Sequence, residues 1–285
     1  MNEVFSIVEG HFGKVVIFEV CHDLVPHVHS ELEFGYWLGG GQCRGRVSDE
    51  PVVYSESQAV GVNRYQAHDL LLGDVGESVL MLKLYIDEVW FDEHFTHCGV
   101  PINFQKAQLI HTDEMKTKCW ELTQKILLTK KNPFSIENDV MTLLQITIDN
   151  NIAQTNRYPN AVRRKMLDYR LRLALCCIDD NMTRHDLMQS LPQFVGVSRS
   201  RLYELFKDEL QSTPNLIWNC VLLDNATKRI VEKQENVSLV SADLGFSTAA
   251  NFSRFFRGHK GVTPSTYRKG MCTPSTNSTK RHELE

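Results

Sequence analysis

Two kinds of hydrophobic pattern divide this chain. From Phe5 to Ile86, short runs of alternating apolar residues are interrupted by Gly, Pro, Asn and Asp, as in residues 13–20 and 78–85. Runs of this length and period predict many short strands, and therefore a barrel or a sandwich. Beyond residue 110, apolar residues recur at spacings of three and four, which predicts helices. The pattern thus predicts an α+β chain with a β domain first and an all-helical domain last.

Two amphipathic segments follow the predicted strands. The first has its apolar stripe at Met115, Cys119, Leu122 and Ile126, and the second at Ile136, Val140, Leu143 and Ile148. Residues 131–133, Lys-Asn-Pro, separate them, so we expect an antiparallel helical hairpin over residues 111–153. Such stripes cover the core of their own domain or contact a second copy of the chain, and both interpretations remain open.

The C-terminal part carries one pattern twice, at a separation of about fifty residues. In each copy apolar residues at helical spacing lie on both sides of a single glycine, Gly196 or Gly245, and each copy closes on a Thr-Pro pair. Glycine relieves the steric conflict of a tight turn between two short helices. The sequence therefore predicts two helix-turn-helix motifs, at about residues 187–207 and 237–257.

The second helix of each motif is expected to begin at a serine, Ser198 or Ser247, whose hydroxyl can cap exposed backbone N–H groups. The residues that then point outward include Arg, Asn and Ser, which read base edges or hold phosphates, and Ala, which can contact a thymine methyl. Ordinary helical hairpins with solvated polar faces are the alternative, which the duplication disfavours. The candidate DNA contacts are Arg199, Ser200, Arg201, Tyr203, Glu204, Thr248, Ala250, Asn251, Arg254, Arg257 and Lys260.

Residues 196–207 and 243–257, with the closing stretch 261–268, resemble the C-terminal domain of AraC/XylS transcription regulators. The resemblance covers residues 171–268. Pro192 and Ser241 stand where that family usually has Ala, and Asn219 and Val221 replace the usual Arg residues of the connecting helix. The resemblance implies a homodimeric regulator that binds double-stranded promoter DNA, contacts RNA polymerase and responds to a small-molecule effector held in its N-terminal domain.

His27, His29, Glu33 and Gly40 have the spacing of the first cupin motif, and His68 lies where the second motif would supply its histidine. This half of the chain resembles the cupin-like effector-binding barrel of AraC-type regulators. Imidazoles and a carboxylate are suitable metal ligands; they can equally line a pocket without metal, and we predict neither a metal nor another cofactor. Tyr36, Trp37, Arg64 and Tyr65 could supply an aromatic wall and a charge clamp for a ligand. The candidate effector-binding residues are therefore His27, His29, Glu33, Tyr36, Trp37, Arg64, Tyr65 and His68.

Composition sets the cellular context. A length of 285 residues predicts two domains. No apolar run reaches membrane-spanning length and the first residues lack the basic region of a signal peptide, so we expect a cytoplasmic protein without membrane contact. The eight cysteines show no metal-type spacing and are expected to be reduced thiols.

The net charge of −4 conceals an asymmetry between the two parts. Residues 1–159 hold 12 Lys and Arg against 22 Asp and Glu, a net charge of −10, whereas residues 160–285 hold 19 against 13, a net charge of +6. A positive domain attracts a polyanion such as DNA, and an acidic domain is kept away from it.

The expected domain boundaries follow from these patterns. We predict a barrel at 1–110, the helical hairpin at 111–153, a linker at 154–160, the DNA-binding domain at 161–270 and a flexible tail at 271–285. Residues 163–178 should be helical, with an extended connection after them. One helix over residues 215–234 should join the two motifs; it would span about 30 Å, close to the ~34 Å between successive major-groove faces.

Two other functional classes compete with a regulator. In one, the barrel is a metal-dependent cupin enzyme with a DNA-binding appendage; in the other, the chain is an architectural DNA protein that needs no ligand. No combination of nucleophile and base in the sequence supports a hydrolase. We therefore predict a non-enzymatic, sequence-specific regulator.

Overall fold

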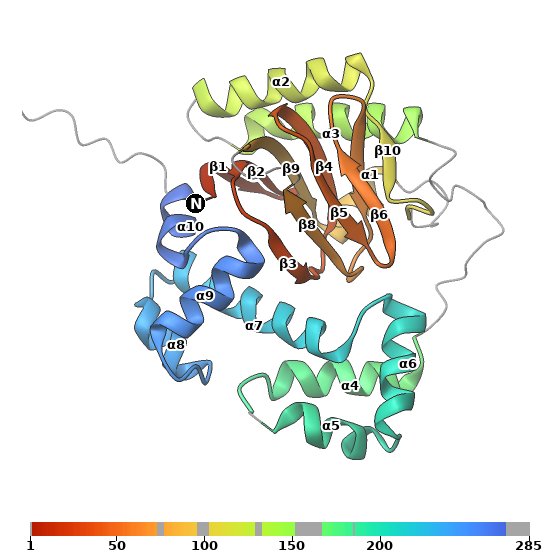
Figure 1. Ribbon diagram of the computed structural model, residues 1–285, viewed down its shortest axis with the longest axis vertical. Helices are drawn as coiled ribbons and strands as arrows, with labels where there is room; N and C mark the ends of the chain where they lie inside the picture. The colour runs from red at the N-terminus through yellow and green to blue at the C-terminus, as the bar shows by residue number, and fades with distance from the viewer. Residues whose placement is uncertain are drawn as a thin grey trace, which may run out of the picture.

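A computed structural model describes residues 2–72, 77–95, 103–128, 133–151, 167–184 and 186–271. A β-sandwich forms the first part and a set of helices the last, which is the predicted α+β architecture (Figure 1). The hairpin of α2 (Asp113–Leu128) and α3 (Pro133–Asn150) lies on one side of the sandwich, and the C-terminal helices lie on the opposite side.

Two antiparallel sheets make up the sandwich. The larger has the strand order β1-β2-β9-β4-β7-β10 and the smaller β3-β8-β5-β6. The predicted succession of short strands over the first 86 residues is thereby confirmed, and β10 pairs with β7 at the sheet edge. The strands are β1 (Glu3–Gly10), β2 (Gly13–Val20), β3 (Leu24–His27), β4 (Leu32–Gly40), β5 (Cys43–Val47), β6 (Glu50–Tyr54), β7 (Gln58–Val62), β8 (His68–Leu72), β9 (Val79–Ile86) and β10 (Gln108–Ile110).

Alternation along the central strands assigns each side chain to one of two cores. On β9, Leu82 and Leu84 face the α2–α3 hairpin, whereas Met81 belongs to the core between the sheets. Both predicted helical stripes are buried against the larger sheet, so the hairpin covers the core of its own domain. One helix was not predicted, α1 (Glu88–Phe95), whose Trp90 and Phe91 are buried in this core.

The C-terminal part contains two short helical pairs joined by a long helix, as predicted. Gly196 (φ 74°) and Gly245 (φ 83°) occupy the left-handed backbone region at the two turns, which explains the repeated glycine. Pro192 and Ser241 are both buried in the first helices of the pairs. The helices are α4 (Tyr169–Asp180), α5 (Leu187–Val195), α6 (Arg199–Leu210), α7 (Pro214–Val231), α8 (Val237–Asp243), α9 (Ala249–Lys260) and α10 (Pro264–Met271).

One predicted helix cap is wrong. Ser198 caps α6 as expected, its Oγ accepting from the backbone N–H of Arg201 at 3.2 Å. In the second motif the cap is Thr248, whose Oγ1 accepts from the backbone N–H of Asn251 at 3.1 Å. Thr248 has the extended backbone that a capping residue requires, and the Ser247 hydroxyl accepts from the Asn251 side chain instead.

Several predicted boundaries also change. The connecting helix α7 ends at Val231 rather than at residue 234, and Gln234 has a left-handed backbone (φ 53°). The predicted extended connection after residue 178 is partly wrong, because α4 continues to Asp180. The linker at 154–160 and the tail after Met271 lie outside the described residues. No described helix is long and apolar enough to cross a membrane.

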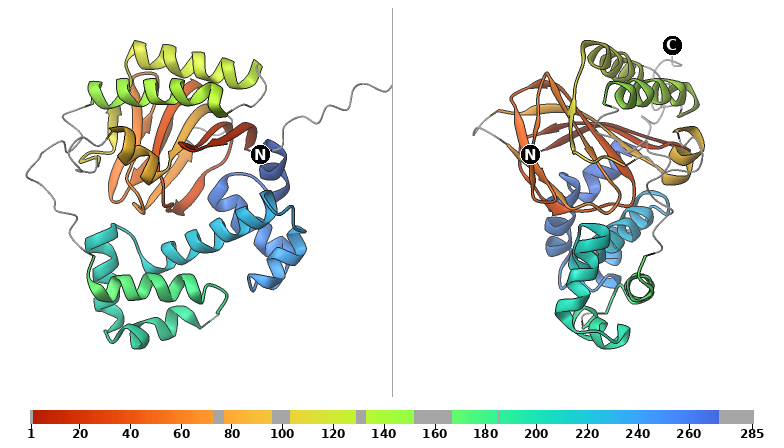
Figure 2. Two further views of the ribbon diagram at one scale, coloured as in Figure 1. Left: turned by 180° about the vertical axis from the view of Figure 1, so that it is seen from behind. Right: turned by 90° about the vertical axis from the view of Figure 1, so that its right-hand side faces the viewer.

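The two parts of the chain share a core. Phe18 and Met81 of the sandwich belong to the same buried cluster as Leu223 of α7 and Phe252 of α9. Figure 2 shows α9 and α10 beside the N-terminal strands in two further views. At this contact, a side chain on Gly261 would come within 3.1 Å of the Asn2 amide and 3.2 Å of Leu24, so the helices and the sheet approach closely.

Candidate functional site

The polar face of α6 carries five of the candidate DNA contacts. Leu202, Leu205 and Phe206 are buried on the opposite face and fix the rotation of the helix. Arg201 donates to Glu204 at 3.1 Å, and the Arg199 guanidinium lies 5.7 Å from the centre of the Tyr203 ring. The residues of this face are Arg199, Ser200, Arg201, Tyr203 and Glu204, and all are exposed except the half-buried Tyr203.

The polar face of α9 is built in the same way. Phe252 and Phe256 are fully buried, and the candidate contacts Thr248, Ala250, Asn251, Arg254 and Arg257 are exposed. Arg254 donates to the side-chain Oδ1 of Asn251 at 3.0 Å, which orders two side chains capable of reading bases.

Lys260 is the one candidate that the structure does not bring to this face. It is half-buried and its Nζ lies 4.0 Å from Asp224 of α7, next to the sandwich. It lines a small cavity with Lys14 and Tyr85.

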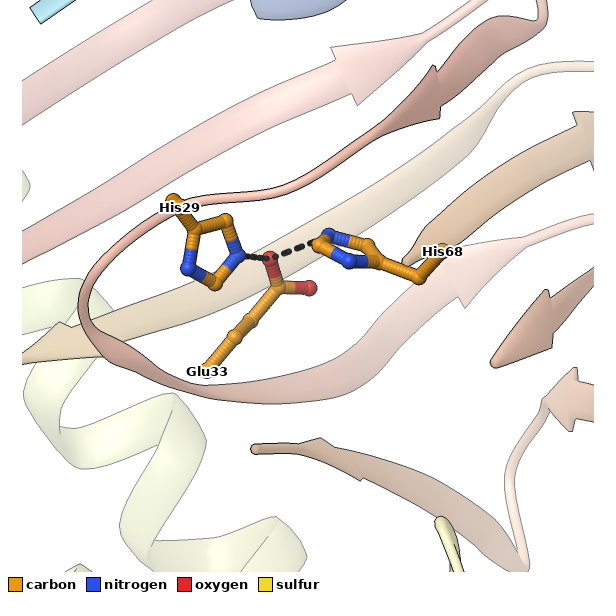
Figure 3. Close-up of side chains that lie close together, drawn as sticks. All are labelled: His29, Glu33 and His68. Carbon is orange, nitrogen blue, oxygen red and sulfur yellow. Dashed lines mark hydrogen bonds and ion pairs between the residues drawn. The ribbon is translucent and has the colours of Figure 1, made fainter. Parts of the chain in front are cut away.

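Four candidate effector-binding residues converge in the interior of the sandwich. His27 ends β3, His29 follows it, Glu33 lies on β4 and His68 begins β8. All four are at least nine-tenths buried. One Glu33 oxygen lies 3.0 Å from His29 Nε2 and 3.4 Å from His68 Nε2, as Figure 3 shows. The His27 and His68 rings are 4.2 Å apart between centroids.

Backbone carbonyls orient all three rings. Nδ1 of His27, His29 and His68 lies 2.8–2.9 Å from the carbonyl oxygens of Val25, Glu31 and Gln66, respectively. Because Nδ1–H is the group that can donate to a carbonyl, Nε2 of each ring is left for the interior.

The sequence reasoning missed Lys83, which completes this cluster. Its Nζ lies 2.5 Å from the second Glu33 oxygen, and the side chain is 1% exposed. Lys83 pairs with Gly35 across the β4–β9 pair, and the Tyr54 ring fills the space beside that glycine. Burial alone would raise the pKa of Glu33, but the Lys83 charge and the bonds to His29 and His68 outweigh it and hold that pKa well below its usual range.

The other four effector candidates lie elsewhere. Tyr36 is on the opposite face of β4 from Glu33, where its hydroxyl bonds Thr147 of α3 at 2.8 Å. Trp37 donates to the Gly41 carbonyl at the end of the strand. Arg64 pairs with Glu88 and Asp92 of α1. Tyr65 packs against the core of the first helix-turn-helix motif. The structure therefore does not assemble these residues into one pocket with the histidines.

The comparisons with known proteins concern mainly the C-terminal part. The helix-turn-helix domain family matches residues 191–270. The raffinose operon transcriptional regulatory protein RafR of Pediococcus pentosaceus is 27% identical over 99 residues, 35% of this chain and 36% of RafR. The probable transcription factor PqrA of Proteus vulgaris is 30% identical over 82 residues, which are 29% of this chain and 67% of PqrA. The chain belongs to the AraC/XylS family of transcriptional regulators.

A solved structure has a similar fold over both parts of the chain. ToxT from Vibrio cholerae, in a crystal structure with a bound unsaturated fatty acid, superposes with a TM-score of 0.52 at 14% identity. The match covers 90% of this chain and 95% of ToxT, so it includes both the sandwich and the helices.

The cluster of this AraC-type regulator fits a metal ion in donor type but not in charge. Two imidazoles and a carboxylate, those of His29, His68 and Glu33, offer ligand atoms within 4.8 Å of one another and are suitable donors. However, the Lys83 ammonium already balances the Glu33 carboxylate at 2.5 Å. A divalent ion would leave a buried site with excess positive charge, which is costly in a low-dielectric interior. Lys83 thus already places a buried positive charge beside Glu33.

Removing Lys83 is expected to create a zinc site. Zn²⁺ should leave the unfolding temperature of the wild type unchanged and raise that of Lys83→Met, because the variant frees Glu33 for a metal while keeping His29 and His68. Thermal melts with and without zinc measure this, and Lys83→Met/Glu33→Gln is the control that should lose the effect. Equal zinc stabilisation of wild type and Lys83→Met would contradict the role of Lys83.

Acidification is expected to destabilise the sandwich through His27. Burial, followed by the charges of His68, His29 and Lys83, holds the pKa of His27 well below its usual value. Between the unfolded pKa of ~6.5 and the lower folded pKa, the unfolded chain binds a proton that the native chain does not, so stability falls as pH falls. The slope should reach about 1.4 kcal/mol per pH unit for this group.

Urea unfolding between pH 7 and pH 5 measures that slope. His27→Gln should flatten it, whereas His22→Gln, at an exposed position of the same part of the chain, should leave it as in the wild type. An unchanged slope in His27→Gln would assign the pH dependence to other groups.

Proposed function

We propose that this chain binds double-stranded promoter DNA sequence-specifically, with α6 and α9 as its two reading helices. The observation that carries the proposal is the pair of exposed polar faces, presented at matching positions of a duplicated motif. The 18 residues of α7 between the motifs correspond to about 27 Å of helix. With the width of the motifs added, this length would place α6 and α9 in adjacent turns of the major groove, which are ~34 Å apart on one side of a duplex.

The roles of the individual contacts follow from their chemistry. Arg199, Arg254 and Arg257 supply phosphate or guanine contacts, and Asn251 has the donor and acceptor pair that recognises adenine. Ala250 offers a methyl group to thymine, and Ser200, Tyr203, Glu204 and Thr248 adjust the sequence preference.

We further propose that a small-molecule effector controls DNA binding, and that the regulator acts as a homodimer that contacts RNA polymerase. ToxT, which shares the two-part fold, has been solved with a bound unsaturated fatty acid. A dimer is supported by exposed apolar side chains on the hairpin, namely Trp120 (43%), Leu127 (52%) and Leu128 (83%) of α2 and Phe134 (74%) of α3.

An enzymatic role is the less supported alternative. A metal-dependent cupin enzyme needs a cation at the histidine cluster, and the Lys83–Glu33 pair already neutralises that carboxylate. We therefore propose a regulator rather than an enzyme.

Selection of duplexes from a random pool, followed by affinity measurement at near-physiological salt, tests the function. A selected duplex should bind roughly 10³-fold or more tightly than a scrambled duplex of the same length. Equal affinity for both duplexes, with and without candidate effectors, would reject sequence-specific regulation and favour an architectural role.

A further inference from the structure

A cleft of about 670 Å³ separates the sandwich from the first reading helix. This volume is within the range of pockets that hold small molecules. The sandwich contributes the β5–β6 turn, the segment at Gln66 and Ala67, and Phe104 with Ala107, and the helical part contributes α6 and the turn after it. Both parts of the chain therefore form the walls of this cleft.

The wall contributed by α6 is its candidate DNA-reading face. Ser200, Tyr203, Glu204 and Lys207 line the cleft, and their spacing of three and four places them on one side of the helix. The corresponding face of α9 lies in the open: Ala250, Asn251 and Arg254 are exposed. Most residues of both faces are exposed, and α6 differs in that its face also forms one wall of a cleft.

Direct contacts hold α6 against the sandwich. The Gln211 side-chain oxygen accepts from Ser48 Oγ at 3.1 Å and from Gln66 Nε2 at 2.8 Å. Lys207 Nζ lies 4.0 Å from a carboxylate oxygen of Asp49. These are exposed polar contacts, which are individually weak and readily exchanged. Val28, Tyr65 and Ala67 of the sandwich also pack against the apolar cluster that contains Leu202 and Phe206 of α6, so buried apolar surface joins the two walls as well.

The lining defines the chemistry of an occupant. Phe104, Ala107 and the Tyr203 ring offer apolar surface. Ser212, only 3% exposed, has a hydroxyl without a hydrogen-bond partner among the described residues. Asp49, Glu50 and Glu204 bring three carboxylates to the lining against the one ammonium of Lys207, which lies 4.0 Å from Asp49, while Arg201 pairs with Glu204 from beside the cleft. Such a lining attracts a molecule with an apolar body and a positive charge and repels an anion.

We propose that this cleft binds an organic cation, an amine or guanidine on an apolar or aromatic body, and that its occupant excludes DNA from α6. The inference deepens the proposed function, on which it rests, by naming the effector site and the sign of its effect. Ligand and DNA use the same side chains of α6, so each lowers the affinity for the other by the same factor. The effector is in this case an antagonist of DNA binding.

Three indole compounds with one body and different charges test the ligand class: tryptamine, tryptophol and indole-3-acetate. Calorimetry on the full chain should show tryptamine binding about tenfold or more tightly than indole-3-acetate, with tryptophol between them. Saturating tryptamine should then weaken binding to the selected duplex by about tenfold or more. Equal affinity for the three compounds, no binding of any, or unchanged DNA affinity at saturation would each overturn the proposal.

Paired variants locate the site. Asp49→Asn/Glu50→Gln removes two carboxylates of the cleft. The double variant should bind tryptamine less tightly, and tryptamine should lower its DNA affinity by a smaller factor than in the wild type. Asp113→Asn/Glu114→Gln makes the same change at an exposed Asp-Glu pair on α2, which lies across the sandwich from α6 (Figure 1), and should leave both quantities unchanged. Equal effects of the two double variants would overturn the assignment to the cleft.

The outcome also separates this inference from the proposed function. If the protein prefers the selected duplex but does not bind tryptamine, the proposed function stands and the cleft is not the effector site. If the protein shows no preference between the selected and scrambled duplexes, the proposed function itself is rejected.

Discussion

Replacing Glu33 by alanine is expected to destabilise the folded protein by about 3–5 kcal/mol, because it leaves the buried Lys83 ammonium without its counter-ion. The carboxylate is fully buried, and one of its oxygens lies 2.5 Å from Lys83 while the other faces His29 and His68. Water cannot replace these contacts in the interior. Urea unfolding at pH 7 measures the loss.

The double variant Glu33→Leu/Lys83→Met tests whether the loss comes from the unpaired charge. An apolar pair of similar volume is expected to restore much of the stability, since a buried ion pair is often replaceable by well-packed apolar side chains. Glu3→Ala, at an exposed position of β1, is the control and should have little effect. A Glu33→Ala variant as stable as this control would show that the cluster is solvated.

The composition of the cluster could be predicted from the sequence only in part. His27, His29, Glu33 and His68 have a recognisable spacing, and the structure brings them together. Lys83 has no motif. Its one signal was a charged residue inside the otherwise apolar run of residues 79–86, which a strand buried on both faces can hold only if the charge is paired.

Strand alternation explains why the effector candidates did not form one pocket. Tyr36 and Trp37 are neighbours in sequence, so they point to opposite faces of β4 and cannot form one aromatic wall. Arg64 is held by α1, a helix that was not predicted. Both errors arise because residues were grouped by sequence proximity rather than by the face on which they lie.

The helix-turn-helix motifs were predictable because their information is local. Glycine at the turn, apolar spacing and capping side chains determine each helical pair within about twenty residues. The packing of α6 against the sandwich depends instead on Ser48, Gln66 and Gln211, which lie up to 163 positions apart in sequence. No pattern within one segment indicates such a contact.

Replacing Arg254 by alanine is expected to weaken binding to the selected duplex by about 1–3 kcal/mol. Arg254 is exposed on α9, and its hydrogen bond to Asn251 at 3.0 Å orders it next to a second candidate base contact. A contact to a base edge carries sequence information, so the variant should lose more affinity for the selected duplex than for a scrambled one. Fluorescence anisotropy with both duplexes at one salt concentration measures the two losses.

Two further variants separate base reading from charge. Arg257→Ala removes an exposed charge of the same helix. If Arg257 contacts phosphate, the variant should lose affinity for both duplexes by a similar factor. Lys118→Ala removes a charge on α2, on the opposite side of the sandwich (Figure 1), and should change neither affinity. If Arg254→Ala behaves like Lys118→Ala, α9 does not read DNA through this residue. If it behaves like Arg257→Ala, Arg254 positions the helix on the backbone, and sequence choice at α9 falls to Asn251 and Ala250.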